Sequence, residues 1–154
     1  GKYSKIGENR LKEVLNIFEK VNIPLAIENI DNQKIFIETF ENIKHPMLKF
    51  CYDCGHNNVF DKDYDYFSNY NDKLITLHLH DNDGGSDLHT LRKLCNSTID
   101  WEKIALNLKG HENINLDYEI LNKNNSTLSM IEFLKEAFLQ AQELENLIQR
   151  SEKY

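Results

Sequence analysis

Residues 74–87 read LITLHLHDNDGGSD, and this stretch decides how the rest of the chain is interpreted. Its first part alternates apolar and polar residues, so Leu77 and Leu79 point to one side of a predicted strand while His78 and His80 point to the other. The stretch ends in three aspartates and a pair of glycines. Imidazoles and carboxylates at the C-terminal end of a strand are unusual in a purely structural strand, so this stretch indicates a metal site.

Three other stretches have the same form. They are PLAIEN, which carries Glu28, LKFCYD, which ends at Asp53, and INLDYE, which ends at Glu119. Glu28, Asp53 and His78 follow one another at intervals of 25 residues. That interval accommodates one strand, one helix and two loops, which is the size of a parallel repeating unit. The pattern therefore predicts an α/β fold with about four parallel strands alternating with helices.

The alternation along these strands predicts which side chains share a face of the sheet. If the apolar residues face the covering helices, then Glu28, Asp53, His78 and Glu119 all lie on the opposite face, at the same end of four strands. Four side chains of the kinds that bind hard metal ions would then converge. The apolar residues expected to face the helices are Ile23, Leu25, Ile27, Leu48, Phe50, Tyr52, Ile75, Leu77, Leu79, Ile114, Leu116 and Tyr118.

Helical periodicity between the strands completes a single domain over residues 1–154. Pro24 ends the first helix, and Asp100 is the expected N-cap of the fourth helical segment. The stripe of the last helix that we expect to be buried includes Phe133, Leu134 and Phe138. The expected helices cover about residues 6–21, 32–43, 61–71 (a weak helix or a turn-rich connection), 100–108 and 126–148.

Composition excludes several classes of protein. The net charge of −7 argues against a nucleic-acid partner, because phosphate neutralisation needs clustered Lys and Arg. No run of about 18 apolar residues is present, so we expect no membrane span, and without an apolar signal region at the start we expect a cytoplasmic protein. Cys51, Cys54 and Cys95 form no disulfide framework, and buried or turn thiols are favoured over a redox pair or half of a zinc site.

Several short motifs, taken in order, resemble those of the sugar phosphate isomerase/epimerase superfamily. That superfamily has the xylose-isomerase-like TIM barrel, a fold shared with the DNA-repair enzyme endonuclease IV. The resemblance covers about residues 10–140. The motifs are EN at 28–29, DCGH at 53–56, HLHDN at 78–82, DLH at 87–89, IDW at 99–101 and YE at 118–119.

The resemblance implies that this chain is the C-terminal half of a (β/α)8 TIM barrel. Its strands would be strands five to eight, with strands one to four absent, since a closed barrel needs about 250 residues. Four parallel strands alone expose two edges and half a core. We therefore expect either a fragment of a longer protein, which is the favoured interpretation, or a half-barrel that pairs with a second copy or another half.

The resemblance also implies a metal-dependent isomerase or epimerase acting on a sugar or sugar phosphate. One Mn, Mg, Co or Zn ion would be held by Glu28, Asp53, His78 and Glu119, polarising substrate oxygens and stabilising an enediolate. Glu28 and Glu119 would also shuttle the proton beside the carbonyl, one on each face. His56 would contact substrate oxygens, while Asp81 or His89 would orient His78 or bind substrate.

Some choices stay open at the level of sequence. Spacing does not separate His78 from His80 as the ligand, and only the resemblance favours His78. The loop before IDW reads LCNST where relatives often carry a Pro-Gly-x-Gly turn, so loop closure over substrate can differ. Plain structural roles also compete: a helix cap for Glu28, an Asx-turn for Asp53 with His56, and a solvated loop for Asp87 with His89.

Two other functions compete with the isomerase. The first is a zinc phosphodiesterase similar to endonuclease IV, acting on abasic DNA. The second is a non-catalytic half-barrel module. The residues that match the zinc ligands of endonuclease IV are Asp53, His56, His78, Asp87, His89 and Glu119.

Overall fold

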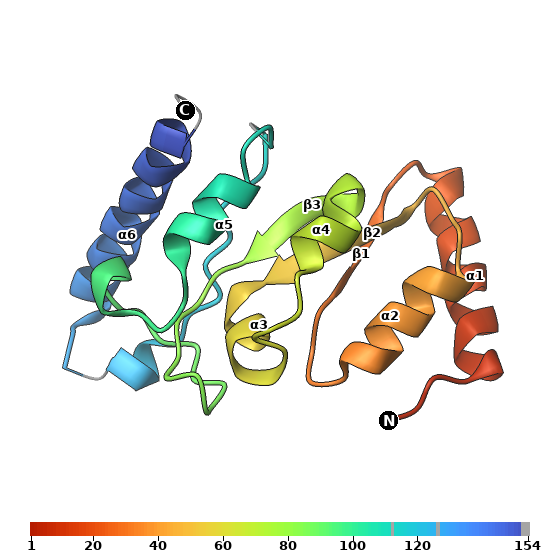
Figure 1. The fold of residues 1–154 in the computed structure, drawn as a ribbon, viewed down its shortest axis with the longest axis horizontal. Helices are drawn as coiled ribbons and strands as arrows, with labels where there is room; N and C mark the ends of the chain where they lie inside the picture. Colours follow the sequence, from red (N-terminus) through yellow and green to blue (C-terminus); the bar gives the residue numbers. More distant parts are fainter. Residues whose placement is uncertain (112, 126, 152–154) are drawn as a thin grey trace.

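Helices and strands alternate along the chain (Figure 1). The structure is a computed structural model that describes residues 1–111, 113–125 and 127–151. In the view of Figure 1 the chain runs from α1, beside the N-terminus, through a central sheet to α6, beside the C-terminus. The elements are α1 (Lys5–Lys20), β1 (Leu25–Glu28), α2 (Gln33–Asn42), β2 (Leu48–Asp53), α3 (Cys54–Phe60), α4 (Tyr66–Tyr70), β3 (Leu74–His78), α5 (Trp101–Asn107) and α6 (Met130–Ser151), with short 3-10 turns at Asn71–Lys73, Leu94–Asn96 and Asn122–Asn125.

The sheet is parallel, and its strands lie in the order β1-β2-β3. Glu28 pairs with Cys51, and Asp53 pairs with His78. The C-terminal ends of the three strands therefore lie together at one end of the sheet. The predicted parallel α/β arrangement is confirmed.

The predicted fourth strand, residues 114–119, is only partly formed. A single parallel bridge joins Leu79 to Tyr118, where the Leu79 N–H donates to the Asp117 carbonyl and the Glu119 N–H donates to the Leu79 carbonyl. The segment nevertheless runs beside β3 in the expected direction, which brings Glu119 to the same end of the sheet.

A β-bulge changes the register at the start of β3. Phe50 pairs with Leu74 while the next residue, Cys51, pairs with Thr76, so Ile75 is the extra residue. As a result Leu74 is buried in the core and Ile75 is 39% exposed. The prediction that Ile75 faces the helices was therefore wrong, whereas Leu77 and Leu79 are fully buried as expected.

The helices begin at side-chain caps. Ser4, Asn32 and Asp65 each accept a hydrogen bond from a backbone N–H in the first turn of α1, α2 and α4, and Asp100 caps α5 as predicted. Within the predicted weak helix at 61–71 only Tyr66–Tyr70 is α-helical, as α4, and the structure adds α3 directly after β2, which was not predicted. The predicted start of the last helix, residue 126, lies outside the described residues, and α6 begins at Met130.

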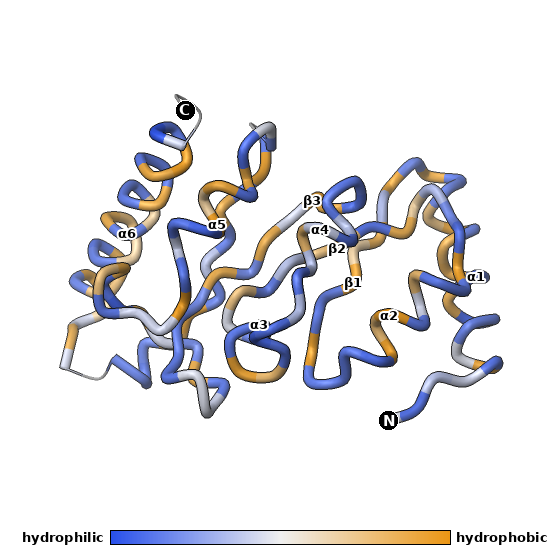
Figure 2. Tube along the Cα trace, in the orientation of Figure 1, coloured by the Kyte–Doolittle hydropathy of each residue, from blue (hydrophilic) through white to orange (hydrophobic). Residues whose placement is uncertain are grey.

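One hydrophobic core lies against the sheet and joins the covering helices. It includes Phe36 and Phe40 from α2, Phe50 from β2, Trp101 from α5 and Leu144 from α6. Figure 2 shows apolar and polar turns alternating along α6. The stripe predicted for α6 was too wide, because Phe133 is buried while Leu134 and Phe138 are 59% and 63% exposed.

The three thiols are free, with Cys51 and Cys54 buried and Cys95 exposed. Burial raises the pKa of Cys51 to about 12 and that of Cys54 well above its usual value. Buried thiols are therefore the interpretation that this structure favours for the CxxC pair. Among the described residues, no helix is both long and apolar enough to cross a membrane.

Candidate metal centre

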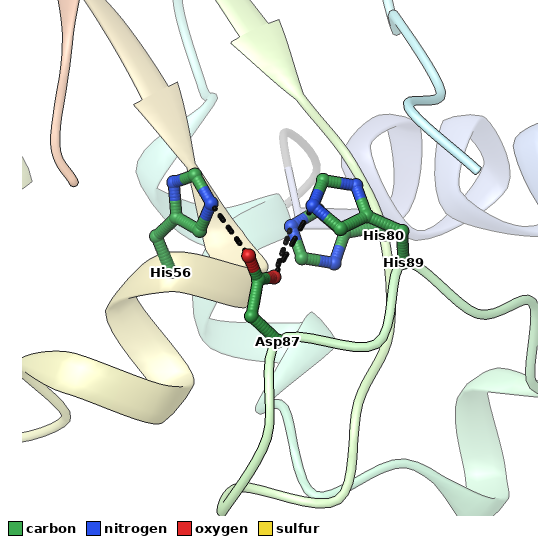
Figure 3. A group of neighbouring side chains, drawn as sticks. All are labelled: His56, His80, Asp87 and His89. Atoms are coloured by element: carbon green, nitrogen blue, oxygen red, sulfur yellow. Dashed lines mark ion pairs between the residues drawn. The ribbon is translucent and has the colours of Figure 1, made fainter. Parts of the chain in front are cut away.

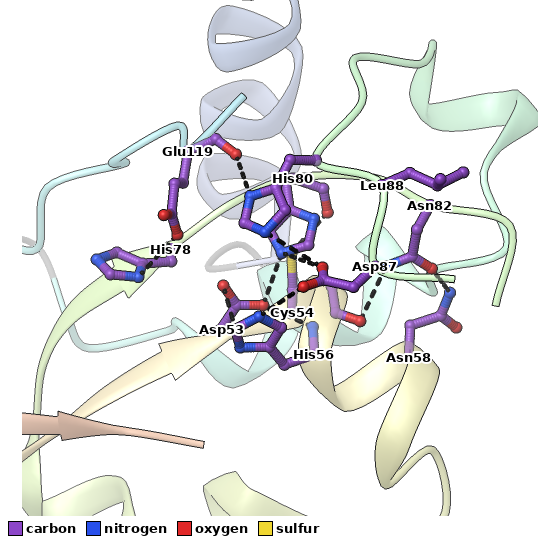
Figure 4. A network of polar contacts seen from close by, with 12 residues as sticks. Asp53, Cys54, His56, Asn58, His78, His80, Asn82, Asp87, Leu88 and Glu119 are labelled. Carbon is purple, nitrogen blue, oxygen red and sulfur yellow. Dashed lines mark hydrogen bonds and ion pairs between the residues drawn. The ribbon is translucent and has the colours of Figure 1, made fainter. Parts of the chain in front are cut away.

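Four of the predicted ligands converge at the C-terminal end of the sheet. Glu28, Asp53, His78 and Glu119 each offer one ligand atom, and these atoms all lie within 4.8 Å of one another. The His78 Nδ1 atom lies 3.3 Å from Glu28 Oε1 and 3.2 Å from Glu119 Oε2. Figure 4 shows His78 and Glu119 turned toward each other beside Asp53. We call this set of four residues group one.

Asn29, which follows Glu28 in the EN motif, holds β2 in place beside β1. Its side-chain amide donates to the Asp53 carbonyl at 2.9 Å and accepts from the Asp53 N–H at 2.8 Å. Asn29 is 1% exposed, so these hydrogen bonds are shielded from water. The Asp53 carboxylate also caps α3, since its Oδ1 accepts the His56 N–H at 2.6 Å. The backbone around Asp53 is therefore fixed on both sides of the carboxylate.

A second set of residues adjoins group one. His56, His80, Asp87 and His89, which we call group two, also offer ligand atoms within 4.8 Å of one another. Figure 3 shows the Asp87 carboxylate lying between His56 on one side and the His80 and His89 rings on the other. Asp87 Oδ2 lies 3.3 Å from His56 Nε2, while Asp87 Oδ1 lies 3.2 Å from His89 Nε2 and 3.7 Å from His80 Nε2.

Backbone carbonyls fix which nitrogen of two of these rings carries hydrogen. His56 Nδ1 lies 3.0 Å from the Asn29 carbonyl, and His89 Nδ1 lies 2.9 Å from the Glu119 carbonyl. A carbonyl only accepts, so Nδ1 is the donor in both rings. Nε2 of each ring therefore faces Asp87, where it can carry a proton or bind a cation. Metal-binding histidines commonly donate their other ring N–H to a carbonyl or a carboxylate in this way, which fixes the orientation of the ring.

Asp53 connects the two groups. It is a member of group one, and its Oδ1 atom lies 3.1 Å from His80 Nε2 of group two. The residue is fully buried. A carboxylate between two adjacent sets of ligand atoms is an arrangement seen where two cations lie close together.

The neighbouring imidazoles of His56 and His78 favour the ionised form of Glu28. Burial raises the pKa of this carboxyl, but the hydrogen bond and charge of His56, together with the charge of His78, outweigh it and lower the pKa to about 2. Burial lowers the pKa of His56, but Glu28, Asp53 and Asp87 outweigh it and raise the pKa to about 9. In the absence of a cation, Glu28 and His56 therefore form an ion pair.

Unsatisfied buried atoms test whether a cation fits group one. Within the described part of the chain, Asp53 Oδ2 and His78 Nδ1 are buried without a hydrogen-bond partner, and Glu28 Oε1 lies 3.0 Å from His56 Nδ1 and 3.3 Å from His78 Nδ1. Buried acceptors gathered without donors carry a desolvation cost that a divalent cation offsets. The donor set of three carboxylates and one imidazole fits Mg²⁺ or Mn²⁺ well and also permits Zn²⁺ or Co²⁺.

Asp81 lies apart from both groups. Its carboxylate is buried and accepts the Asn82 N–H at 2.7 Å, and its backbone bridges to Thr90. Burial raises the pKa of Asp81, against the effect of Ser97, Asn82 and Trp101 around it. The structure therefore does not bring this predicted substrate-binding residue to the ligand atoms. It positions the loop that follows β3.

His56 and His89, expected to contact substrate, lie in group two with His80 and Asp87. The sequence signal for Asp87 and His89 was the DLH motif. His80 was seen as an alternative to His78, whereas the structure assigns the two histidines to different groups. Alternation along the strand could show only that both point inward.

Helices cover the parallel sheet, and the candidate ligands lie at the C-terminal ends of its strands. This arrangement is typical of α/β barrel proteins, which have their sites at that end of the strands. Within this class, the chain belongs to the xylose isomerase-like TIM barrel family, whose sequence profile matches residues 6–137. The match extends over most of the chain and is consistent with a partial barrel. The prediction of this family and fold is confirmed.

Two relatives give the extent of the similarity. An uncharacterized protein of Methanocaldococcus jannaschii is 30% identical over 135 residues, which cover 82% of this chain and 51% of that protein. The crystal structure of a D-tagatose 3-epimerase-like protein superposes with a TM-score of 0.64 at 20% identity, covering 93% of this chain and 54% of that one. This likeness shows the fold. The chain spans about half the length of each relative.

Proposed function

We propose that this chain carries the metal centre of a metal-dependent isomerase or epimerase that acts on a sugar or sugar phosphate. One observation carries the proposal: the ligand atoms of Glu28, Asp53, His78 and Glu119, delivered by four segments, lie within 4.8 Å of one another. The cation held there would be Mn, Mg, Co or Zn. We also propose that residues 1–154 form one domain corresponding to strands five to eight of the barrel.

The two glutamates of group one would move the proton. When bound, the cation supplies charge that polarises the carbonyl and hydroxyl oxygens of the substrate. Glu28, whose carboxyl is ionised, takes the proton from the carbon beside the carbonyl, and the C–H electron pair forms the carbon–carbon double bond of an enediolate. Glu119, which is about half exposed, returns a proton to the opposite face.

Metal content and proton exchange test this proposal together. The chain is loaded with Mn²⁺ and incubated with D-tagatose in D2O. We expect deuterium to enter at the carbon beside the carbonyl. Glu119→Gln should lose the group-one ion and the exchange, while Glu143→Gln, which changes an exposed carboxylate on α6, should keep both. An unaltered metal content in Glu119→Gln would contradict the proposed ligand set.

A second candidate is a phosphodiesterase of the endonuclease IV kind, and the position of group two favours it. Adjacent cations stabilise the attacking and leaving oxygens in many phosphoester hydrolases. The net charge of −7 opposes this candidate, because contact with DNA phosphates requires clustered cations. Incubation of the Zn²⁺-loaded chain with an abasic-site duplex distinguishes the two: we expect no cleavage, and cleavage would replace the isomerase proposal.

A further inference from the structure

We infer that His80 is a positioning residue of group one: it holds one oxygen of the Asp53 carboxylate, so that the other oxygen is left for the cation. This inference rests on the proposed function, because it needs a cation in group one. It gives His80 the role of a hydrogen donor, separate from the ligand role proposed for His78, two residues earlier.

The two oxygens of the Asp53 carboxylate have different surroundings. Oδ1 accepts the His56 N–H at 2.6 Å and lies 3.1 Å from His80 Nε2. Oδ2 is buried and has no hydrogen-bond partner among the described residues. His56 Nδ1 is 3.7 Å from Oδ2 and faces the Asn29 carbonyl at 3.0 Å. The protein therefore engages the carboxylate through Oδ1, and Oδ2 keeps its lone pairs for a cation.

Burial gives the contact between His80 and Asp53 its weight. Neither side chain has any exposed surface. An ionised carboxylate inside a protein is costly without donors, and a charge-assisted contact with an imidazole offsets that cost. An apolar side chain at residue 80 would fill the same space and leave Oδ1 with the His56 N–H alone.

The contact also determines where the His80 ring carries hydrogen. A nitrogen lone pair that faced a carboxylate oxygen at 3.1 Å would repel it, so the hydrogen lies on Nε2 and points toward Asp53. The Asp87 carboxylate, whose Oδ1 lies 3.7 Å away, faces the same nitrogen. Because two carboxylates face Nε2, this atom is a donor and is not free to bind a cation.

Gly55 provides the space that the His80 ring occupies. A Cβ atom at residue 55 would fall 2.0 Å from His80 Cε1 and 2.4 Å from each ring nitrogen. The first turn of α3 therefore accepts the imidazole only because residue 55 has no side chain. The ring also stacks on His89, with centroids 3.9 Å apart and planes inclined by 10°, and the Cys54 thiol donates to the His80 carbonyl. Ring and backbone are thus both held, as positioning a carboxylate requires.

Metal binding by His80→Leu and His80→Gln tests the inference. Leucine fills the space without a donor, whereas the Gln amide places an N–H near the position of the imidazole Nε2. The EDTA-treated chains are titrated with Mn²⁺ by calorimetry. We expect His80→Leu to bind Mn²⁺ about 10- to 100-fold more weakly than the wild type, and His80→Gln to bind it within about threefold of the wild type. Equal losses in the two variants, or no loss in His80→Leu, would overturn the inference.

Two further variants separate this inference from the proposed function. His111→Leu changes a histidine whose contact with Asn71 is exposed, and it should bind Mn²⁺ as the wild type does. If Glu119→Gln binds Mn²⁺ as tightly as the wild type, the proposed ligand set is wrong and this inference falls with it. If Glu119→Gln loses the ion while His80→Leu keeps the wild-type affinity, only this inference falls.

A measurement on the unmodified chain covers the case in which the His80 variants do not fold. Long-range proton–nitrogen correlation spectra of the isotope-labelled chain, loaded with diamagnetic Mg²⁺, show which ring nitrogen of each histidine carries hydrogen. We expect His80 to carry hydrogen on Nε2. An Nε2 atom of His80 without hydrogen would overturn the inference, because such an atom cannot donate to Asp53.

Discussion

At the scale of single residues, Asn29 shows how a side chain outside the ligand set can determine the site. It contacts the backbone of Asp53 and no ligand atom of group one, yet it joins the ends of β1 and β2 through two buried hydrogen bonds. Glu28 and Asp53 belong to different strands, so their spacing depends on this link. The EN motif therefore supplies one residue of the proposed ligand set and one positioning residue.

Replacing Asn29 should weaken metal binding more than its distance from the cation would imply. In Asn29→Ala the Asp53 N–H and carbonyl lose their partners, so we expect a loss of about 1–3 kcal/mol in unfolding free energy. We also expect a 10- to 100-fold loss of Mn²⁺ affinity, measured by calorimetric titration. Asn42→Ala is the matched control, because its amide makes an exposed hydrogen bond on α2. Equal Mn²⁺ affinities for Asn29→Ala and the wild type would refute the positioning role.

Single residues also mark the limit of sequence-based prediction. Alternation and strand ends were sufficient to bring Glu28, Asp53, His78 and Glu119 together. The same reasoning did not separate His78 from His80, because a period of two places both on one face. Their different environments depend on Gly55 and on the loop that carries Asp87 and His89. Such loop positions are set by tertiary contacts that no local pattern encodes.

At the scale of elements, α1 begins with a compact ion cluster around Glu8. Its Oε1 accepts from Lys5 at 2.6 Å and from Lys12 at 2.7 Å, while Oε2 accepts from the Tyr3 hydroxyl at 2.8 Å. The hydrogen bonds from Lys12, Lys5 and Tyr3 outweigh the effect of burial and lower the pKa of Glu8 to about 2. The cluster joins the segment before α1 to its first three turns.

This cluster should make stability depend on acid pH. The pKa of Glu8 is lower in the folded state than the usual 4.5, so its contribution is complete above about pH 4.5 and is lost as the pH falls toward 2. We expect Glu8→Gln to lower Tm slightly at pH 7 and to match the wild type near pH 2. Thermal unfolding followed by circular dichroism measures the difference. Glu13→Gln, an exposed change in the same helix, should show no such trend.

The elements themselves were predicted unevenly. The helices with strong apolar periodicity and clear caps, α1, α2 and α5, match the predictions closely. Local patterns did not reveal the bulge at Ile75 or the short pairing of residues 114–119. Both depend on how neighbouring strands align in space. A strand is stabilised by its partners, so its length and register are decided outside its own sequence.

At the scale of the whole molecule, one core supports the elements that carry the residues of group one. Phe50 lies at its centre, fully buried, with ring centroids 5.2 Å from Phe36, 5.8 Å from Tyr66 and 5.9 Å from Tyr70. Its neighbours along β2 include Asp53, the carboxylate shared by groups one and two. Packing on one face of β2 therefore determines the position of the Asp53 carboxylate on the other face.

Truncating Phe50 should affect stability and metal binding together. Phe50→Ala leaves a cavity among the aromatic rings, and we expect a loss of about 3–5 kcal/mol in unfolding free energy, measured by urea denaturation. Zn²⁺ or Mn²⁺ should raise the unfolding free energy of the variant less than that of the wild type, because cations that bind only the folded chain stabilise it by mass action and the variant binds them more weakly. Leu106→Ala, which truncates an exposed side chain on α5, should change the free energy by less than about 0.5 kcal/mol. If Phe50→Ala were as stable as Leu106→Ala, the aromatic cluster would not be the structural support of the metal centre, and the ligands would have to be held by the loops alone.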